Sequence, residues 1–144
     1  RSVGVWRVNL CIGGWWEEII LDDYLPCSDK DMSPQFGRSV DEPAEMWVAV
    51  MEKAYAKVHA SYAAVCGGDE TDALQDLTGF PCERFSFGFG DSIFAKITEW
   101  ARLGHLMTAT VNPRTVESDP RGMDAGLVRS HGYTLLRAVE ADGI

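Results

Sequence analysis

A run of apolar residues between Trp47 and Val65 constrains the fold of this chain more than any other feature of its sequence. Its members recur at spacings of three and four residues, which is the period of one face of an α-helix. They are Trp47, Val50, Met51, Ala54, Tyr55, Val58, Tyr62 and Val65. Glu42-Pro43 precedes the run, where a first helical turn tolerates proline, and Gly67-Gly68 follows it. The sequence therefore predicts one long helix that begins at Glu42-Pro43 and is stopped by the two glycines.

Two strand-like runs, at Val5–Ile12 and Trp15–Leu21, precede this helix. Both are rich in the aromatic and β-branched residues that are typical of strands. Gly13-Gly14 separates them and suits a tight turn between antiparallel strands. We therefore expect a β-hairpin, followed by a loop over residues 27–42, where Ser, Asp, Gly and Pro are frequent.

The second half of the chain combines short helical and strand-like segments. We expect a short helical turn at residues 69–76 and a helix over residues 93–103 that is capped by Asp91 or Ser92 and ended by Gly104. Strand-like composition occurs at residues 84–90, 106–111 and 126–139. Helices and strands occupy separate stretches, so the predicted fold class is α+β.

Composition and charge limit the kinds of partner that the chain can bind. Hydrophobic residues make up 46% of the chain and aromatic residues 10%, which is enough for a core. The net charge is −9 and the pI is about 4.7, and an acidic surface argues against nucleic acid and anionic membranes. No apolar run reaches the about 18 residues of a transmembrane helix, and no signal peptide is visible.

The cysteines offer no strong candidate nucleophile. The chain has four of them, Cys11, Cys27, Cys66 and Cys82, with neither a CxxC pair nor zinc-ligand spacing. A broad core without a leader favours reduced, mostly buried thiols in a cytosolic compartment. None of these residues is expected to open a helix behind a glycine-rich turn, where a helix N-terminus would lower the pKa of the thiol.

His131 lies in a strand-like stretch between Ser130 and Gly132, two small neighbours that leave room around its imidazole. Histidine suits proton transfer because its unperturbed pKa lies near neutrality. A single histidine in a strand is also a common structural residue. On the residues alone, both the catalytic and the structural interpretation are open.

The acidic and aromatic pairs have ordinary structural interpretations. Asp22-Asp23 fits a metal site or a turn cap, and we favour the cap because adjacent residues of a strand point to opposite faces. Trp15-Trp16 and Trp47 are assigned to the core, where large aromatic residues are usually buried. No calcium loop of the Asp-x-Asp-x-Asp-Gly type occurs.

Several segments, taken together, carry a resemblance to a known family. They are Trp16–Pro26 with its Asp-Asp-Tyr-Leu-Pro ending, Glu45–Lys57 with Glu-Lys-Ala-Tyr-Ala-Lys, Tyr62–Gly68 with Gly-Gly, Asp76-Leu-Thr-Gly79, and Gly126–Leu135 with Gly-Leu-Val and His-Gly-Tyr-Thr. In their order and spacing, over nearly the whole chain, they resemble the protease core of the calpain-type cysteine proteases.

This resemblance implies a fragment of a papain-like cysteine protease core. Residues 1–66 would end the first lobe, and residues 67–144 would begin the β-rich second lobe. His131 takes the place of the family's catalytic histidine. Gly67 and Gly68 match the glycines whose backbone pairs with the bound peptide, and Glu45 matches a carboxylate that helps to bind calcium in the first lobe.

The resemblance also implies that this chain does not cleave peptides alone. The family's cysteine would precede Arg1, and its asparagine would follow Ile144. The other calcium ligands of the first lobe lie upstream, so we expect calcium in the intact parent core and none bound by this chain alone. The family's Ala-Tyr-Ser after the histidine is Gly132-Tyr133-Thr134 here.

Two functions follow from the resemblance. The first is a fragment of a calcium-dependent cysteine endopeptidase that acts on polypeptide substrates. The alternative is a calpain-like pseudoenzyme that serves as a protein-binding or scaffold module. Either would be intracellular, cytoplasmic or cytoskeleton-associated, and the fragment is expected to self-associate through apolar surface.

Overall fold

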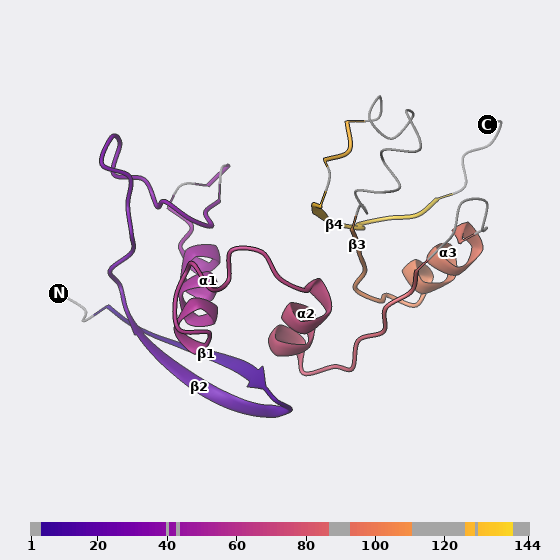
Figure 1. Ribbon diagram of the computed structural model, residues 1–144, viewed down its shortest axis with the longest axis horizontal. Helices are drawn as coiled ribbons and strands as arrows, with labels where there is room; N and C mark the ends of the chain where they lie inside the picture. Colours follow the sequence, from indigo (N-terminus) through magenta and orange to yellow (C-terminus); the bar gives the residue numbers. More distant parts are fainter. Residues whose placement is uncertain are drawn as a thin grey trace. The chain divides into compact units, whose positions relative to one another are not determined.

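The computed structural model describes residues 4–39, 41–42, 44–86, 93–110, 126–128 and 130–139. In chain order the elements are β1 (Val5–Ile12), β2 (Trp15–Asp22), α1 (Trp47–Val58), α2 (Glu70–Thr78), α3 (Phe94–Arg102), β3 (Thr108–Thr110) and β4 (Gly132–Thr134) (Figure 1). Within these ranges β1 pairs with β2 and β3 pairs with β4. The expected mixture of helices and small sheets is therefore confirmed.

The chain divides into two compact units, Arg1–Arg84 and Phe85–Ile144. The first contains the hairpin, α1 and α2, and the second contains α3, β3 and β4. The compact unit thus continues through α2, beyond the expected end of the first lobe at residue 66. A division of the intact core into lobes at residues 66 and 67 stays a prediction.

The predicted hairpin is confirmed with its turn. β1 and β2 are antiparallel, and Ile12 faces Trp15 across Gly13-Gly14. Both glycines have positive φ, 58° and 86°, which suits a two-residue turn whose twist matches that of the strands. A residue with a side chain would adopt this backbone only with strain.

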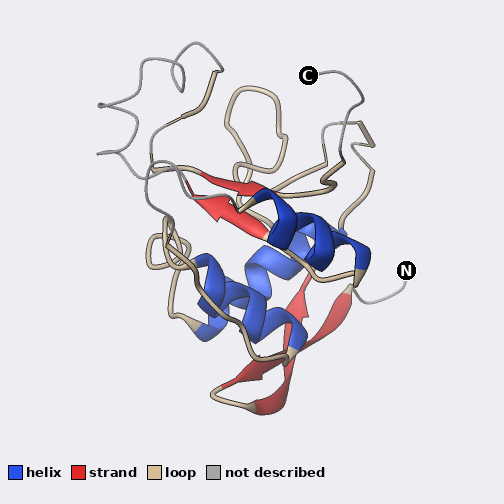
Figure 2. Ribbon diagram, turned by 90° about the vertical axis from the view of Figure 1, so that its right-hand side faces the viewer, coloured by secondary structure: helices blue, strands red, loops and turns tan. Residues whose placement is uncertain are grey.

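The core of the first unit lies between one face of the hairpin and α1. Val8 and Leu10 of β1, Leu21 of β2, and Val50 and Ala54 of α1 form its buried cluster. In Figure 2 the hairpin is the pair of long strands at the lower end of the view. The alternation of strand side chains places these residues on one face, and the spacing of four in α1 matches them.

The long helix is shorter than predicted. It spans Trp47–Val58 rather than the whole of the apolar run to Val65. Ala60 has a left-handed backbone with φ of 78°, which ends the helical conformation soon after the C-cap residue His59. At the other end the N-cap position is Met46, without a side-chain cap, and Pro43 lies outside the described residues.

Tyr62 lies beyond the end of α1 and packs elsewhere. Its ring stacks on Phe36 with the centroids 4.3 Å apart and the planes at 7°. The contact fixes the loop after the hairpin against the turn after the helix. Apolar spacing alone predicted a continued helix because it does not show which partner an aromatic ring will contact.

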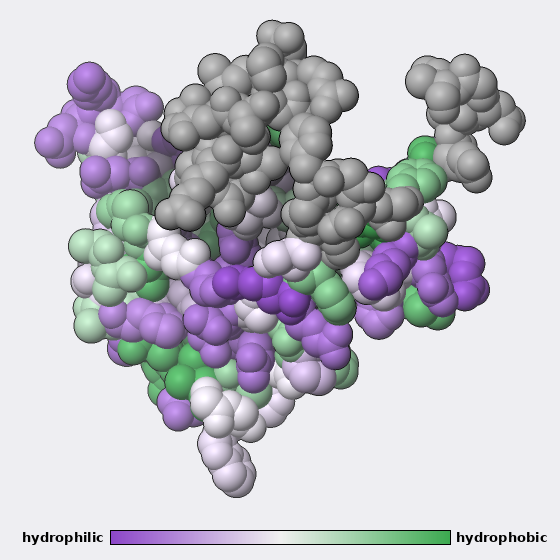
Figure 3. Space-filling view, turned by 45° about the vertical axis from the view of Figure 1, so that its right-hand side comes forward, coloured by the Kyte–Doolittle hydropathy of each residue, from purple (hydrophilic) through white to green (hydrophobic). Residues whose placement is uncertain are grey.

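The assignment of the tryptophans to the core is wrong. Trp15 is 78% exposed, and Trp16 and Trp47 are each 59% exposed. Trp15 and Trp16 lie next to the hairpin turn, away from the buried cluster around Leu10. Figure 3 shows hydrophobic residues interspersed with hydrophilic ones on the described surface.

The shorter helices follow their predictions at the C-terminal end. α2 spans Glu70–Thr78, close to the helical turn expected at residues 69–76. α3 ends at Arg102, two residues before Gly104, which has φ of 77°. The N-cap position of α3 is Ile93, without a side-chain cap, and Asp91 and Ser92 lie outside the described residues.

The predicted strands of the second unit are longer than the observed ones. β4 covers only Gly132–Thr134 of the expected 126–139. On its N-terminal side, Gly126 and Ser130 have positive φ of 75° and 51°, which interrupts an extended backbone. β3 covers Thr108–Thr110. The strand expected at residues 84–90 is absent at residues 84–86, and the rest of it lies outside the described residues.

Candidate functional site

His131 lies directly before β4 rather than within a strand. Its side chain is exposed, and its ring meets the ring of Tyr133 edge-on, with the centroids 4.9 Å apart and the planes at 80°. Ser130, on its other side, has the left-handed backbone that turns the chain into β4. An imidazole in this position is open to solvent and supported on one side by an aromatic ring.

Tyr133 is itself fixed by the surrounding backbone. Its hydroxyl accepts a hydrogen bond of 2.8 Å from the Val128 amide, and its Cα pairs with Ala109 of β3. The next hydrogen bond along the pair runs from the Leu135 amide to the Met107 carbonyl, at 2.9 Å. The ring against which His131 rests is therefore held by two segments of the chain.

Gly67 and Gly68 form an exposed stretch of backbone between two ordered segments. Gly67 has φ of 89°, and a Cβ added at either glycine would have no atom within 4 Å. Before them, the Ser61 hydroxyl accepts a hydrogen bond from the Ala64 amide at 3.1 Å. Their peptide groups are thus accessible from the side where a Cβ would project.

Asp69 follows the glycines and caps α2. Its carboxylate accepts a hydrogen bond of 2.8 Å from the Thr71 amide and forms an ion pair with the Arg84 guanidinium. The same Arg84 nitrogen donates to the Thr71 hydroxyl at 3.2 Å. The bonds from Thr71, and then the Arg84 contact, hold the pKa of Asp69 below its usual value.

Glu45 is exposed, and its amide donates to the Glu42 carbonyl at 2.9 Å. Across the residues that the structure describes, no group of three or more His, Cys, Asp or Glu side chains is placed to hold a metal ion. Calcium takes six to eight oxygen ligands, and Glu45 supplies one carboxylate, so a role of Glu45 in calcium binding stays a prediction.

The expectation of mostly buried thiols is wrong. All four cysteines are free, but only Cys11 is buried, and Cys66 is exposed. Cys27 and Cys82 are half-buried, and their Sγ atoms donate to the carbonyls of Leu25 and Phe80 at 3.4 and 3.6 Å.

Asp22 caps a turn, as predicted. Its Oδ1 accepts a hydrogen bond of 2.9 Å from the Tyr24 amide. It also accepts one of 2.5 Å from Lys53 Nζ, which donates to the Asp22 and Tyr24 carbonyls as well. The Lys53 bond, followed by the Tyr24 bond, lowers the pKa of Asp22.

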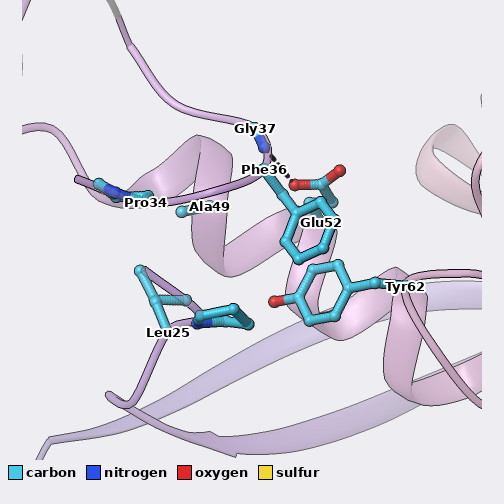
Figure 4. Close-up of a pocket in the computed structure, with 8 residues that line it drawn as sticks. Leu25, Pro34, Phe36, Gly37, Ala49, Glu52 and Tyr62 are labelled. Carbon is cyan, nitrogen blue, oxygen red and sulfur yellow. Dashed lines mark hydrogen bonds between the residues drawn. The ribbon is translucent and has the colours of Figure 1, made fainter. Parts of the chain in front are cut away.

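A small pocket lies between the loop after the hairpin and α1 (Figure 4). Phe36 and Tyr62 stack at its side, and Glu52 Oε2 accepts a hydrogen bond of 2.5 Å from the Gly37 amide. Its cavity volume is about 10 Å³, which is room for about one water molecule, whereas ligand pockets begin at about 300 Å³. Packing of the loop on α1 therefore accounts for these contacts.

Sequence reasoning did not find a polar cluster between α1 and α2. His59 Nε2 lies 3.4 Å from Asp76 Oδ2, and the His59 ring packs on Tyr55 with the centroids 4.3 Å apart. Burial, and then the Asp76 carboxylate, raises the pKa of Tyr55. The spacing of four between Tyr55 and His59 was a signal for their contact, whereas nothing local indicated Asp76.

Comparison with known sequences places the chain in a family of cysteine proteases. A family model described as "Calpain family cysteine protease" matches residues 1–143. The chain therefore belongs to the calpain family, and the resemblance found in its sequence is confirmed.

Individual relatives agree with this assignment. The chain is 33% identical to the "Calpain-type cysteine protease DEK1" of Zea mays, an alignment that covers 97% of the chain and 7% of that protein. It is 34% identical to "Calpain" of Schistosoma mansoni, covering 92% of the chain and 17% of that protein. For "Calpain-5" of Mus musculus the identity is 30%, with coverage of 92% and 22%. The chain thus spans less than a quarter of the length of these relatives.

Proposed function

We propose that this chain is part of the catalytic core of a calcium-dependent cysteine endopeptidase, in which His131 is the general acid and base. The observation that carries the proposal is the exposed imidazole of His131 resting on Tyr133, in a chain of the calpain family. In this chemistry a thiolate attacks the peptide carbonyl, and the histidine takes up the thiol proton and delivers it to the leaving amine.

The thiolate and the orienting asparagine would come from parts of the parent protein outside these residues. The free cysteines of the chain do not suit the role of nucleophile. Cys11 is buried within β1, and Cys27 and Cys82 donate to loop carbonyls. Cys66 is exposed but lies in a bend rather than at the start of a helix. Peptide turnover is therefore assigned to the parent protein and not to this chain alone.

The exposed backbone at Gly67-Gly68 supports a peptide-binding role for the two glycines. An extended polypeptide pairs with a protein through backbone N–H and C=O groups, and this needs an approach free of side chains. Both glycines leave open space where a Cβ would stand. The substrate class that fits is a polypeptide in extended conformation.

Calcium is assigned to the intact parent core. Glu45 would contribute one carboxylate there, and the remaining oxygens would come from other parts of the parent. Because Glu45 alone does not fit the coordination of calcium, we expect no micromolar calcium binding by the isolated chain. Isothermal calorimetry of the chain with calcium chloride tests this, and a tight isotherm would refute it.

The test of the proposed function is peptide cleavage by the parent protein, in calcium and in chelator. Wild type should cleave only with calcium, and His131→Ala should lower the rate by about 10²-fold or more, the usual contribution of a general acid and base. His105→Ala removes another exposed histidine and should leave the rate unchanged. Equal rates for both variants would contradict the role of His131.

The alternative function is that of a calpain-like pseudoenzyme that binds a protein partner. The observation that favours it is the absence of a suitable nucleophile among the described cysteines. A folded parent that cleaves no peptide in either condition, and whose partner affinity does not change in His131→Ala, would establish this alternative and exclude the protease.

A further inference from the structure

One side chain holds the segment that follows Gly67-Gly68. Arg84 Nη2 contacts Asp69 Oδ1 and donates to the Thr71 hydroxyl, 13 positions away along the chain. Asp69 is the residue directly after Gly68 and the N-cap of α2. The guanidinium therefore clamps the first turn of α2 next to the two glycines.

The other end of α2 is also held. The N–H of Gly79, the C-cap of α2, donates a hydrogen bond of 2.8 Å to the Gln75 carbonyl. Gly79 also lies so close to the Trp16 indole that an added Cβ would be 2.8 Å from it. α2 is thus fixed to the hairpin at Gly79, and its N-terminal end is fixed by Arg84. Asp69 has a defined position relative to the first unit.

The glycines themselves have little to restrain them. A Cβ added at either glycine would have no other atom within 4 Å. Glycine also loses more backbone entropy on ordering than any other residue. A peptide that pairs with this backbone must meet it in one conformation, so any restraint has to come from the adjacent residues. Asp69, held by Arg84, is the restraint on the C-terminal side.

We propose that Arg84 is a positioning residue for polypeptide binding at Gly67-Gly68. It acts through Asp69 and does not touch the substrate. Without it, the glycine backbone samples more conformations, and the peptide must order that backbone as it binds. This inference rests on the proposed peptide-binding role of the two glycines.

The expected kinetic consequence lies in KM rather than in kcat. Pre-organised backbone binds the substrate and the transition state alike, so its loss weakens both by the same factor. In the parent protein, Arg84→Met should raise KM by about two- to fivefold, the range of a partly exposed ion pair, with kcat within about twofold. Arg84→Lys should rescue part of the loss because an ammonium group still pairs with Asp69.

The matched control is Arg102→Met, which removes an exposed arginine from the last turn of α3. It should leave KM unchanged. Asp69→Asn, which keeps a capping oxygen, should raise KM as Arg84→Met does, and the double variant should add no further loss. An equal KM for Arg84→Met and Arg102→Met, or additive losses in the double variant, would overturn the inference.

A second measurement does not depend on activity. The ¹⁵N order parameters of the Gly67 and Gly68 amides are measured by NMR relaxation in this chain, with far-UV circular dichroism to confirm folding. Arg84→Met should lower the order parameters at the two glycines, whereas Arg102→Met should not. Unchanged order parameters overturn the inference even if the parent is a protease. Lower order parameters with no cleavage by the wild-type parent support the Arg84 restraint and refute only the proposed protease function.

Discussion

At the scale of single residues, the absence of a Cβ atom at Gly79 permits both its backbone conformation and a close contact. Its φ of 71° ends α2, and its missing Cβ lets the helix end approach Trp16 and the buried Cys11. Asp22 combines two functions in a similar way, because its carboxylate caps a turn and binds Lys53. Both residues make local geometry depend on contacts with another element.

Gly79→Ala should destabilise the chain more than backbone strain at that position alone would. The left-handed backbone resists a Cβ, and the added atom would lie 2.8 Å from the Trp16 ring. Together these effects should cost about 1–3 kcal/mol of unfolding free energy, measured by urea denaturation. Gly14→Ala is the control, since Gly14 also has a positive φ, 86°, but an added Cβ there would have no atom within 4 Å. Equal losses in the two variants would show that the Trp16 contact is irrelevant.

Asp22 should make the stability of the chain depend on acid pH. Its folded-state pKa lies below the ordinary value of 3.8, chiefly through Lys53. Its contribution is therefore complete above that unfolded-state pKa and is lost as the pH falls through the lower folded-state pKa.

Denaturation of wild type and Asp22→Asn between pH 7 and pH 2 tests this expectation. The difference between their unfolding free energies should be constant near neutrality and should shrink once the pH falls below the ordinary pKa of 3.8. Asp23→Asn removes a neighbouring exposed charge and should show no such change. A difference that grows towards acid pH would contradict the Lys53 contact.

At the scale of elements, α1 is a helix whose contacts stabilise the hairpin. The helix covers one face of the hairpin with Val50 and Ala54. Its Lys53 donates to the carbonyls of Asp22 and Tyr24, at and just after the end of β2. Its Lys57 donates to the Ile20 carbonyl within β2, at 2.7 Å. One helix thus provides both apolar and polar contacts to the hairpin.

Leu10→Ala should remove much of the stability of this packing. Leu10 is fully buried in the cluster between the hairpin and α1, so the cavity should cost about 2–5 kcal/mol. Ile20→Ala is the control, since Ile20 is 50% exposed and keeps its backbone bond to Lys57; it should cost about 0.5 kcal/mol or less. Similar losses in urea denaturation of both variants would contradict the assigned core.

The elements were predictable to the extent that local chemistry determines them. The hairpin followed from strand-like runs around Gly13-Gly14, and the catalytic candidate His131 came from a family motif. The end of α1 was not predictable, because Ala60 adopts a left-handed backbone that its residue type does not favour. Arg84 was missed since its contact with Asp69 joins distant positions and leaves no periodic signal.

At the scale of the whole molecule, the two units differ in how they bury apolar residues. Among the described residues, every buried hydrophobic side chain belongs to the first unit, from Val8 to Ala56. The described helix and strands of the second unit have none. Among the described residues, the burial of apolar side chains that stabilises the fold therefore lies before Phe85.

A chain that ends at Arg84 should fold on its own. It keeps the hairpin, α1, α2 and the Arg84 contact with Asp69. Circular dichroism during urea denaturation should show a cooperative transition for residues 1–84 and none for residues 85–144. A cooperative transition in the second piece alone, or its absence from the first, would contradict this division.

The open edge of β2 has a consequence for how the chain behaves at high concentration. Ile12 and Trp15 pair directly beside the two-residue turn, and from there every second residue of β2 directs its backbone groups away from β1. Ile20 and Asp22 are two of these residues. Lys57 and Lys53 bind the carbonyls of these two residues. A strand from a neighbouring molecule would have to displace both ammonium groups before it could pair there, so the helix that covers the hairpin also protects it from edge-to-edge aggregation.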